Sequence, residues 1–231
     1  MDLDQELRGF GDVCRLFPLP GVVLFPHAVL PLHIFESRYR RMTEDALAGD
    51  RLVTIVQARP GADPNAPADP PIEEVGCVGK ILIHERLPDG RFNFLLLGCR
   101  RVRLIRELAD PGTPYRQAEA RLLEDVPPEE RSGPRRSELI DRFHTLAGRL
   151  GAIDPDLEGM LAGDLPLGHL TDIVAHALGL PSEVKQAFLA DCRVDRRADG
   201  LIAIMQALTA ADPGPVSGSG RKPFPPPFSR N

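Results

Sequence analysis

The chain has 231 residues, of which 42% are hydrophobic and 26% are charged, as in a globular protein that buries a substantial core. The net charge is −5, and residues 14–125 carry 15 Lys and Arg against 15 Asp and Glu. This balance argues against a nucleic-acid partner, because domains that bind nucleic acids usually carry a basic excess. Residues 1–13 form an acidic arm unlike a secretory signal, and no apolar run reaches the ~18 residues of a membrane-spanning helix.

The four cysteines lie far apart, at positions 14, 77, 99 and 192, and no two form a Cys-x-x-Cys pair. This spacing is typical of reduced thiols in a cytoplasmic protein rather than of a disulfide framework or a zinc site. The sequence therefore predicts a cytoplasmic location, no membrane contact, and no metal or other cofactor. It leaves the oligomeric state open.

The first expected elements are short extended pieces. Prolines recur in CRLFPLPGVVLFPHAVLPLHIFE (residues 14–36), and the residue before each proline is driven toward extended geometry, so this stretch cannot be helical. From Glu36 apolar residues recur at a spacing of three to four, which predicts a helix that ends at Gly49. A β-branched strand at 51–58 and a Pro/Ala/Asp loop at 61–71 follow.

A hairpin is the clearest local pattern that comes next. Two β-rich runs flank Pro88-Asp89-Gly90, a sequence typical of a tight turn. In the second run Phe92, Phe94 and Leu96 alternate onto one face, and Gly98 indicates a bulge or a barrel corner.

One further strand is expected in PYRQAEARLLED (114–125). Five or more strands, mostly antiparallel, with one helix between the second and the third predict a small, closed or half-closed barrel over residues 14–125. The fold class is therefore α+β, a pseudo β-barrel followed by helices.

The rest of the chain is expected to be helical. Residues 126–134 (VPPEERSGP) are interpreted as a linker, and 135–210 as an α-helical bundle in which Ser182 caps one helix. Residues 211–231 are rich in Gly, Ser and Pro, and we expect a disordered tail whose PFPPPF is either a polyproline ligand or merely solvated. Four apolar stripes at helical spacing define the bundle: Leu139, Ile140, Phe143, Leu146, Ala147 and Leu150; Leu167, Leu170, Val174, Ala177 and Leu178; Val184, Phe188 and Leu189; Leu201, Ile204, Met205 and Leu208.

Known catalytic motifs are incomplete in this sequence. GCVGKI has a Gly-Lys pair, but it lacks both the earlier glycine and the Ser or Thr that a phosphate-binding loop requires. Ser182 and Lys185 have Ser-x-x-Lys spacing, yet Ser182 begins an amphipathic helix, which favours capping over nucleophilic attack. The sequence thus predicts no catalytic residue.

The histidines allow a weaker alternative. His33 and Glu36 lie three residues apart at the start of a helix and can in principle share a proton or a metal, but no third ligand is visible. Glu36 also suits the helix dipole and a pair with Arg40. His169 and His176 are expected at the edge of the core.

Four arginines form a local basic stripe at positions 100, 101, 103 and 106. One interpretation is that they pair with nearby acidic residues, and the other is an acidic or nucleic-acid partner. Tyr115 is the only aromatic residue near them, so the stacking platform expected for single-stranded nucleic acid is absent.

The order of four motifs resembles the N-terminal domain of Lon proteases. The opening stretch resembles that family's Pro-Leu-Pro strand, VLFP strand and LPL-IFE-RY corner, and the likeness extends over roughly residues 16–208. The motifs are FPLPGVVLFPHAVLPLHIFESRYRRMTEDAL, EVGCVGKILIHERLPDGRFNFLLLGCRRVRLIREL, PYRQAEARLLED and HLTDIVAHALGLPSEVKQAFLADCRVDRRADGLIAIM. The resemblance implies a PUA-like pseudo-barrel with a helical appendage that engages protein substrates. It also implies a stand-alone recognition part, without the ATPase module and Ser-Lys peptidase that follow in the family.

The proline-rich opening stretch is the expected binding region. Leu24, Ile34 and Phe35 are predicted to be core residues. The residues between the prolines are predicted to be exposed and to bind substrate, because a partly exposed apolar patch suits a protein that meets unfolded chains; the alternative is that they close the floor of the barrel. These predicted substrate-binding residues are Phe25, His27, Val29 and Leu30.

The function predicted from sequence is that of a non-catalytic module. It would bind apolar, unfolded or flexible segments of other proteins, as an adaptor in proteolysis or quality control. Two alternatives stay open, an RNA-associated PUA-like module and an ATP-independent hydrolase that uses His33 and Glu36.

Overall fold

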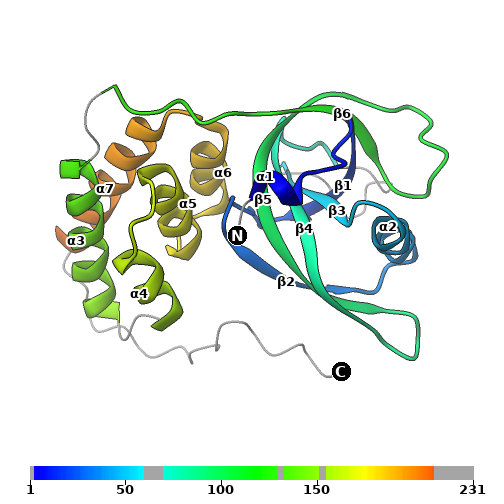
Figure 1. Ribbon diagram of the computed structural model, residues 1–231, viewed down its shortest axis with the longest axis horizontal. Coiled ribbons are helices and arrows are strands. Elements are labelled where there is room, and N and C mark those ends of the chain that lie inside the picture. Colours follow the sequence, from blue (N-terminus) through cyan, green and yellow to red (C-terminus); the bar gives the residue numbers. More distant parts are fainter. Residues whose placement is uncertain (1–2, 60–69, 130–132, 151–154, 211–231) are drawn as a thin grey trace.

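The computed structural model describes residues 3–59, 70–129, 133–150 and 155–210. Figure 1 shows two parts beside one another, a curled sheet and a group of helices. The loop expected at 61–71 lies mostly outside the described residues, and the tail expected at 211–231 lies wholly outside them.

Six strands form one mixed sheet in the order β2-β5-β4-β3-β1-β6. Strands β1 and β3 run parallel and the other pairs are antiparallel. Strand β6 also pairs with the far part of β5, so the sheet curls into a pseudo-barrel rather than a closed barrel. The predicted α+β pseudo-barrel is confirmed. The strands are β1 (Val13–Pro20), β2 (Val29–Ile34), β3 (Leu52–Ala58), β4 (Val75–Arg86), β5 (Phe92–Glu107) and β6 (Gln117–Leu122).

Helix α2 (Ser37–Ala48) connects β2 to β3, as predicted. It buries Tyr39, Met42 and Ala46 against the sheet and ends at Gly49. The long path through β2 and α2 lets β3 return beside β1 in the same direction, since parallel strands need a crossover connection.

The core of the sheet contains the residues that were predicted to be buried, with one exception. Phe92, Phe94 and Leu96 are buried, and so are Leu24 and Ile34. The prediction for Phe35 was wrong, because its side chain is 63% exposed. Successive side chains in extended backbone point to opposite sides, so burial of Ile34 turns Phe35 outward.

The hairpin between β4 and β5 is confirmed, with Gly90 at φ +81° in its turn. The predicted irregularity at Gly98 is also present: Gly79 pairs with Gly98 and Val78 with Arg100, so Cys99 is an extra residue in the ladder.

The second part consists of α3 to α7, while a short α1 (Leu3–Glu6) lies against β5. Helix α4 was not predicted. The helices are α3 (Gly133–Leu150), α4 (Pro155–Ala162), α5 (Leu167–Ala177), α6 (Ser182–Ala190) and α7 (Val194–Ala210). Among the described residues, no helix combines the length and the apolar character needed to cross a membrane.

Two details of the helices differ from expectation. Pro181 takes the extended backbone of the cap position of α6, so Ser182 is already helical and caps nothing. Leu208 is exposed although it shares the helix face of the buried Leu201 and Met205, and it lies in the last turn of α7.

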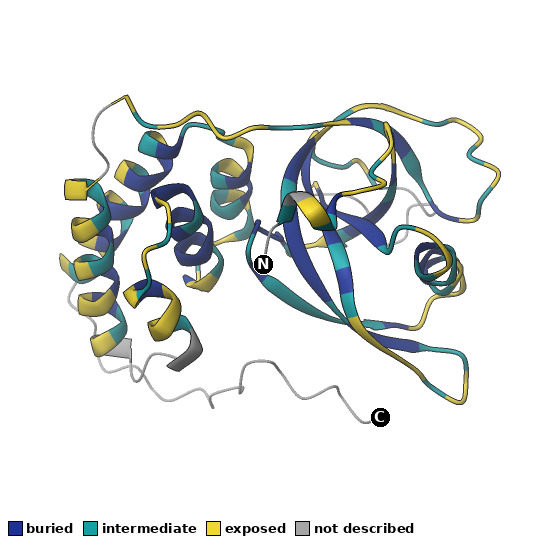
Figure 2. Ribbon diagram, viewed as in Figure 1, coloured by how far each residue is buried: buried dark blue, intermediate teal, exposed yellow. Residues whose placement is uncertain are grey.

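The sheet and the helices share one cluster of buried apolar side chains, which includes Phe25 and Ile81 from the sheet part and Leu170 and Leu189 from the helices. Figure 2 shows exposed residues along α3 and at the far end of the hairpin, whereas β5 is mostly buried up to Val102 and β2 is mostly half-buried. The boundaries at 126–134 stay a prediction, and α3 already begins at Gly133.

Candidate functional site

The structure separates the four residues predicted to bind substrate. Phe25 is fully buried and its ring meets that of His176 edge-on, with centroids 6.4 Å apart, so its predicted exposure was wrong. His27, Val29 and Leu30 are half-buried. Phe25 is therefore a core residue, and Leu30 packs against the core while it stays half-exposed.

A bulge fixes Phe25 and His27 against β5. The N–H of His27 donates to the carbonyl of Gly98, and the N–H of Gly98 donates to the carbonyl of Ala28, both with N···O of 2.8 Å. His27 has φ +66°, the left-handed backbone that such a bulge requires at its first position. A Cβ at residue 98 would lie 2.0 Å from the Phe25 carbonyl oxygen, so only glycine fits there.

Strand β2 leaves this bulge as the last strand of the sheet, with β5 as its partner. Leu30 and Leu32 lie opposite the buried Leu96 and Phe94 and pack against the core, whereas Val29 lies in the alternate set. Both sets stay half-exposed because no other described strand covers β2 from the side.

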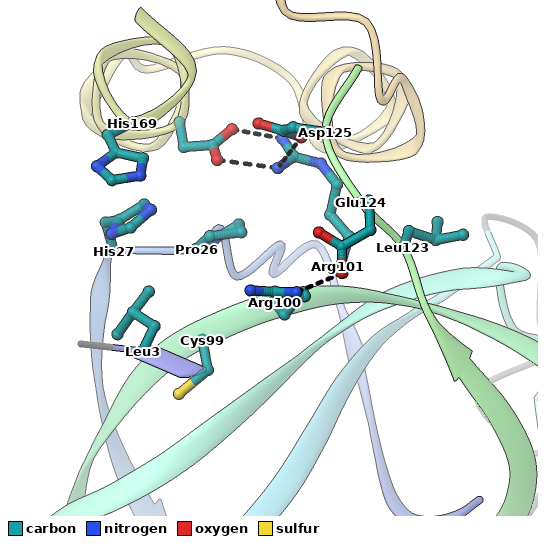
Figure 3. A pocket seen from close by; sticks show the side chains of 11 residues that line it. Leu3, Pro26, His27, Cys99, Arg100, Arg101, Leu123, Glu124, Asp125 and His169 are labelled. Carbon is teal, nitrogen blue, oxygen red and sulfur yellow. Dashed lines mark hydrogen bonds and ion pairs between the residues drawn. The ribbon is translucent and has the colours of Figure 1, made fainter. Parts of the chain in front are cut away.

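A pocket of about 370 Å³ lies where the sheet meets the helices (Figure 3). At its rim the imidazole of His27 faces that of His169 from α5, with ring centroids 3.8 Å apart. Burial, and secondarily the neighbouring His169, lowers the pKa of His27 to about 4, and burial also lowers the pKa of His169. Its lining consists of Leu3, Pro26, His27, Cys99, Arg100, Arg101, Leu123, Glu124, Asp125, His169 and Asp172.

Arg101, Asp125 and Asp172 of the pocket wall form a network with Arg197, in which both arginines and Asp172 are buried and the side chain of Asp125 is 34% exposed. Arg101 donates through Nη1 to Asp172 (2.9 Å) and through Nε to the carbonyl of Leu189 (2.9 Å). Arg197 donates to both carboxylate oxygens of Asp125, at 2.9 and 2.7 Å. Burial raises the pKa of Asp125, but the hydrogen bonds from Arg197 and the charges of Arg101 and Arg197 outweigh it, so the pKa falls.

This network joins the sheet to the helices, and its two guanidinium charges are matched by its two carboxylate charges. Arg101 comes from β5, Asp172 from α5, and Arg197 from α7. The carboxylates are saturated by arginines, so neither Asp125 nor Asp172 is a free general base. The wall therefore orients the helices on the sheet.

The contacts of His33 and Glu36 do not support the alternative in which these two residues form a catalytic pair. Nδ1 of His33 lies 2.7 Å from Oδ1 of Asn93, and its Nε2 lies 3.3 Å from Nη1 of Arg91. Glu36 pairs with Arg38 at 3.0 Å rather than with His33 or with the predicted Arg40. Within the described ranges, no group of three or more His, Cys, Asp or Glu is placed to hold a metal ion.

The basic stripe follows the first of its two interpretations. Arg100 pairs with Glu124 at 2.5 Å, Arg101 lies in the buried network, and Arg106 pairs with Glu119. Three of the four arginines thus contact nearby acidic residues.

Sequence reasoning missed Asp125, Asp172 and Arg197. Arg197 had a usable signal, because it lies three residues after Val194 and four before Leu201, on the apolar face of α7. A charge on an apolar face indicates a buried ion pair. Nothing in the sequence, however, shows which acid meets it.

Comparison with known proteins identifies the family of the chain. The family described as "ATP-dependent protease La (LON) substrate-binding domain" matches residues 13–207. The Lon protease of Xanthomonas oryzae pv. oryzae is 28% identical over 196 residues, which cover 82% of this chain and 22% of that protein. Lon protease 2 of Syntrophobacter fumaroxidans is 33% identical over 128 residues, 55% of this chain and 15% of that protein. The chain thus spans about a fifth of the length of such relatives.

Two solved structures share the fold. A Lon N-terminal domain protein from Xanthomonas campestris superposes with a TM-score of 0.60 at 22% identity, covering 83% of this chain and 97% of that one. The N-terminal domain of a Lon protease from the Mycobacterium avium complex gives 0.66 at 16% identity, covering 84% and 98%. From the family match over residues 13–207, the chain belongs to the LON substrate-binding domain family.

Proposed function

We propose that this chain is a non-catalytic recognition module that binds apolar or unfolded segments of other proteins. The observation that carries the proposal is β2, whose residues from Val29 to Leu32 are apolar, uncharged and half-exposed beside the junction pocket. An exposed apolar patch is typical of a surface that meets other proteins. The family name, which refers to substrate binding, supports the same role.

We further propose that the module works as an adaptor in proteolysis or quality control, in the cytoplasm and without chemistry of its own. The paired carboxylates of the junction and the separation of His33 from Glu36 support a role in binding rather than hydrolysis. The pairing of the basic stripe favours a protein partner over RNA.

The test is fluorescence anisotropy of a labelled, permanently unfolded protein titrated with this chain, beside the same protein in its native form. We expect saturable binding of the unfolded form alone. Val29→Asp should weaken it roughly tenfold, the equivalent of losing one buried aliphatic side chain. Ile105→Asp is the matched control, because Ile105 is an exposed aliphatic residue of β5 away from β2.

Two outcomes would contradict the proposal. One is equal binding of native and unfolded protein, and the other is an equal loss in both variants. Phe25 is unsuitable for this test, since an acidic side chain at a fully buried position would unfold the chain.

A further inference from the structure

Strand β2 has a free edge. It ends the strand order of the sheet, and its pairing partner is β5. The six residues Val29–Ile34 extend for about 20 Å at the usual rise per residue. No other strand in the described part of the chain pairs with the opposite edge.

The hydrogen bonds at the bulge show which backbone groups point to that edge. Ala28 and Gly98 form a bonded pair, and in an antiparallel ladder bonded and non-bonded pairs alternate. Leu30, Leu32 and Ile34 therefore bond to β5. The backbone groups of residues 29, 31 and 33 point away from it.

The pairing of β5 with β4 leads independently to the same assignment of hydrogen-bonded residues. At the hairpin the N–H of Leu87 donates to the carbonyl of Arg91. Odd-numbered residues of β5 next to the hairpin thus bond to β4, which leaves the even-numbered Phe92, Phe94 and Leu96 for β2.

Pro31 fits this assignment, because it has no N–H and stands at a position that bonds to nothing in β5. Proline at such a place is typical of edge strands. The free edge consequently offers two donors, the N–H groups of Val29 and His33, and three acceptors, the carbonyls of Val29, Pro31 and His33. An added strand can form a backbone hydrogen bond with each of these groups, and the single bond missing from a complete ladder is the one that an N–H at Pro31 would make.

The side chains of β2 are apolar on both sides of the sheet except for His33, whose ring contacts Asn93 and Arg91. Leu30 and Leu32 lie on the core side and remain half-exposed. Phe35, 63% exposed, follows the alternate set of Val29 and Pro31. From Pro26 to Phe35 there is no Asp, Glu, Lys or Arg, although edge strands usually carry charges that deter pairing.

A positive hollow lies at the Phe35 end of β2. It begins at Ser37, has a volume of about 230 Å³, and its lining carries three guanidinium groups against one carboxylate. Arg86 pairs with Glu44 at 3.2 Å and Arg41 pairs with Asp45 at 3.0 Å. Arg40 instead donates to the carbonyl of Asp89 at 3.2 Å, so it is the arginine of this hollow that meets no carboxylate among the described residues. An acidic residue at the same end of a bound segment would find complementary charge there. The lining residues are Ser37, Arg40, Arg41, Glu44, Arg86 and Gly90.

We propose that β2 captures its client by strand addition: an extended segment of another protein, apolar at successive positions and with an acidic residue at the end that lies beside Phe35, pairs with the free edge. This inference rests on the proposed function and names its substrate class. Segments apolar on both faces are the buried strands of folded proteins, so they reach this edge only when the client is unfolded. Main-chain bonds supply affinity in this binding mode, and alternate side chains supply selectivity.

The test uses an eight-residue peptide of Val, Ile and Leu with a terminal Asp, made soluble by an ethylene-glycol handle. Amide hydrogen exchange of the whole chain is followed by NMR with and without the peptide. We expect new protection at the amides of Val29 and His33. Leu30 and Leu32, already bonded to β5, should be protected in both samples.

Two variants separate the backbone bond from the side chain. Val29→Pro removes the outward N–H but touches no bond to β5, and Val29→Ala is its matched control, which keeps the N–H. We expect Val29→Pro to bind the peptide about fivefold more weakly than Val29→Ala, as the loss of one hydrogen bond implies. The same peptide with its interior amides N-methylated should lose binding in the wild-type chain.

The outcomes distinguish the two proposals. If the peptide binds without protecting Val29 and His33, and both variants bind equally, strand addition is overturned while the recognition function stands. If neither the peptide nor unfolded protein binds the wild-type chain, both proposals fail. Protection of Val29 and His33 that grows with chain concentration without peptide would assign the edge to a second copy of this chain and overturn the proposed client.

Discussion

Arg101 on β5 donates to both carboxylate oxygens of Asp172 on α5, and both side chains are at most 3% exposed. The bond joins the sheet to the helices. Removal of Asp172 leaves two buried arginines against the single carboxylate of Asp125. An uncompensated buried charge typically costs about 3–5 kcal/mol. We expect Asp172→Asn to lower the free energy of unfolding by about 3 kcal/mol, measured by urea denaturation.

The control for this variant is Asp199→Asn, which removes the carboxylate of an exposed pair with Arg135. Its expected change is below about 1 kcal/mol, because water screens such pairs. The double variant Arg101→Met/Asp172→Leu should recover most of the stability, since an apolar pair of similar volume often replaces a buried ion pair. Similar losses in the free energy of unfolding for Asp172→Asn and Asp199→Asn would show that the buried ion pair stabilises the chain no more than the exposed pair does.

Gly98 allows β5 to approach the Phe25 carbonyl. We expect Gly98→Ala to destabilise the chain by about 3 kcal/mol, because the added methyl group overlaps backbone and forces the His27 bulge to move. Thermal unfolding measures the loss. Gly148→Ala is the control: in α3 its new Cβ meets nothing within 4 Å, and alanine favours helix by up to about 1 kcal/mol. A Gly98→Ala protein of unchanged stability would refute the steric reading of this glycine.

Truncation to alanine should strongly destabilise the chain at one of two phenylalanines, Phe25, and should have little effect at the other, Phe35. Phe25→Ala removes a fully buried ring, and we expect a loss of about 3–5 kcal/mol. Phe35→Ala removes a ring that is mostly in water, and the change should stay within about 0.5 kcal/mol. Urea unfolding of both variants under one set of conditions checks the contrast, which would fail if the two losses were equal.

The facing imidazoles of His27 and His169 should make the chain sensitive to mild acid. The pKa of His27 falls from 6.5 unfolded to about 4 folded, so the unfolded chain binds more protons between these values. The stability that neutral His27 contributes is fully present above pH 6.5 and is lost as the pH falls toward 4.

His27→Asn tests this dependence, because asparagine tolerates a positive φ and does not titrate in this range. Urea midpoints measured from pH 7 to pH 4.5 should fall less steeply in the variant than in the wild type. His144→Asn, at an exposed position of α3, serves as the control and should leave the slope unchanged. An unaltered slope in His27→Asn would contradict the assignment.

Much of the local structure could be predicted because it follows from near neighbours in the chain. Prolines exclude helix, the Pro-Asp-Gly sequence favours a hairpin turn, and the spacing of apolar residues separates strands from helices. These rules located α2, the β4–β5 hairpin and the irregularity at Gly98. The family motifs, in turn, indicated how these pieces are ordered.

The candidate site depended on packing between distant segments, which no local rule contains. Phe25 and Phe35 look alike in sequence, but the bulge opposite Gly98 buries the first, and alternation after Ile34 exposes the second. Likewise, Arg101 meets Asp172 only because α5 folds back onto β5. Periodicity shows which face of a helix or strand is buried. The residues that pack against that face are determined by long-range contacts, whose free energies depend on the whole fold.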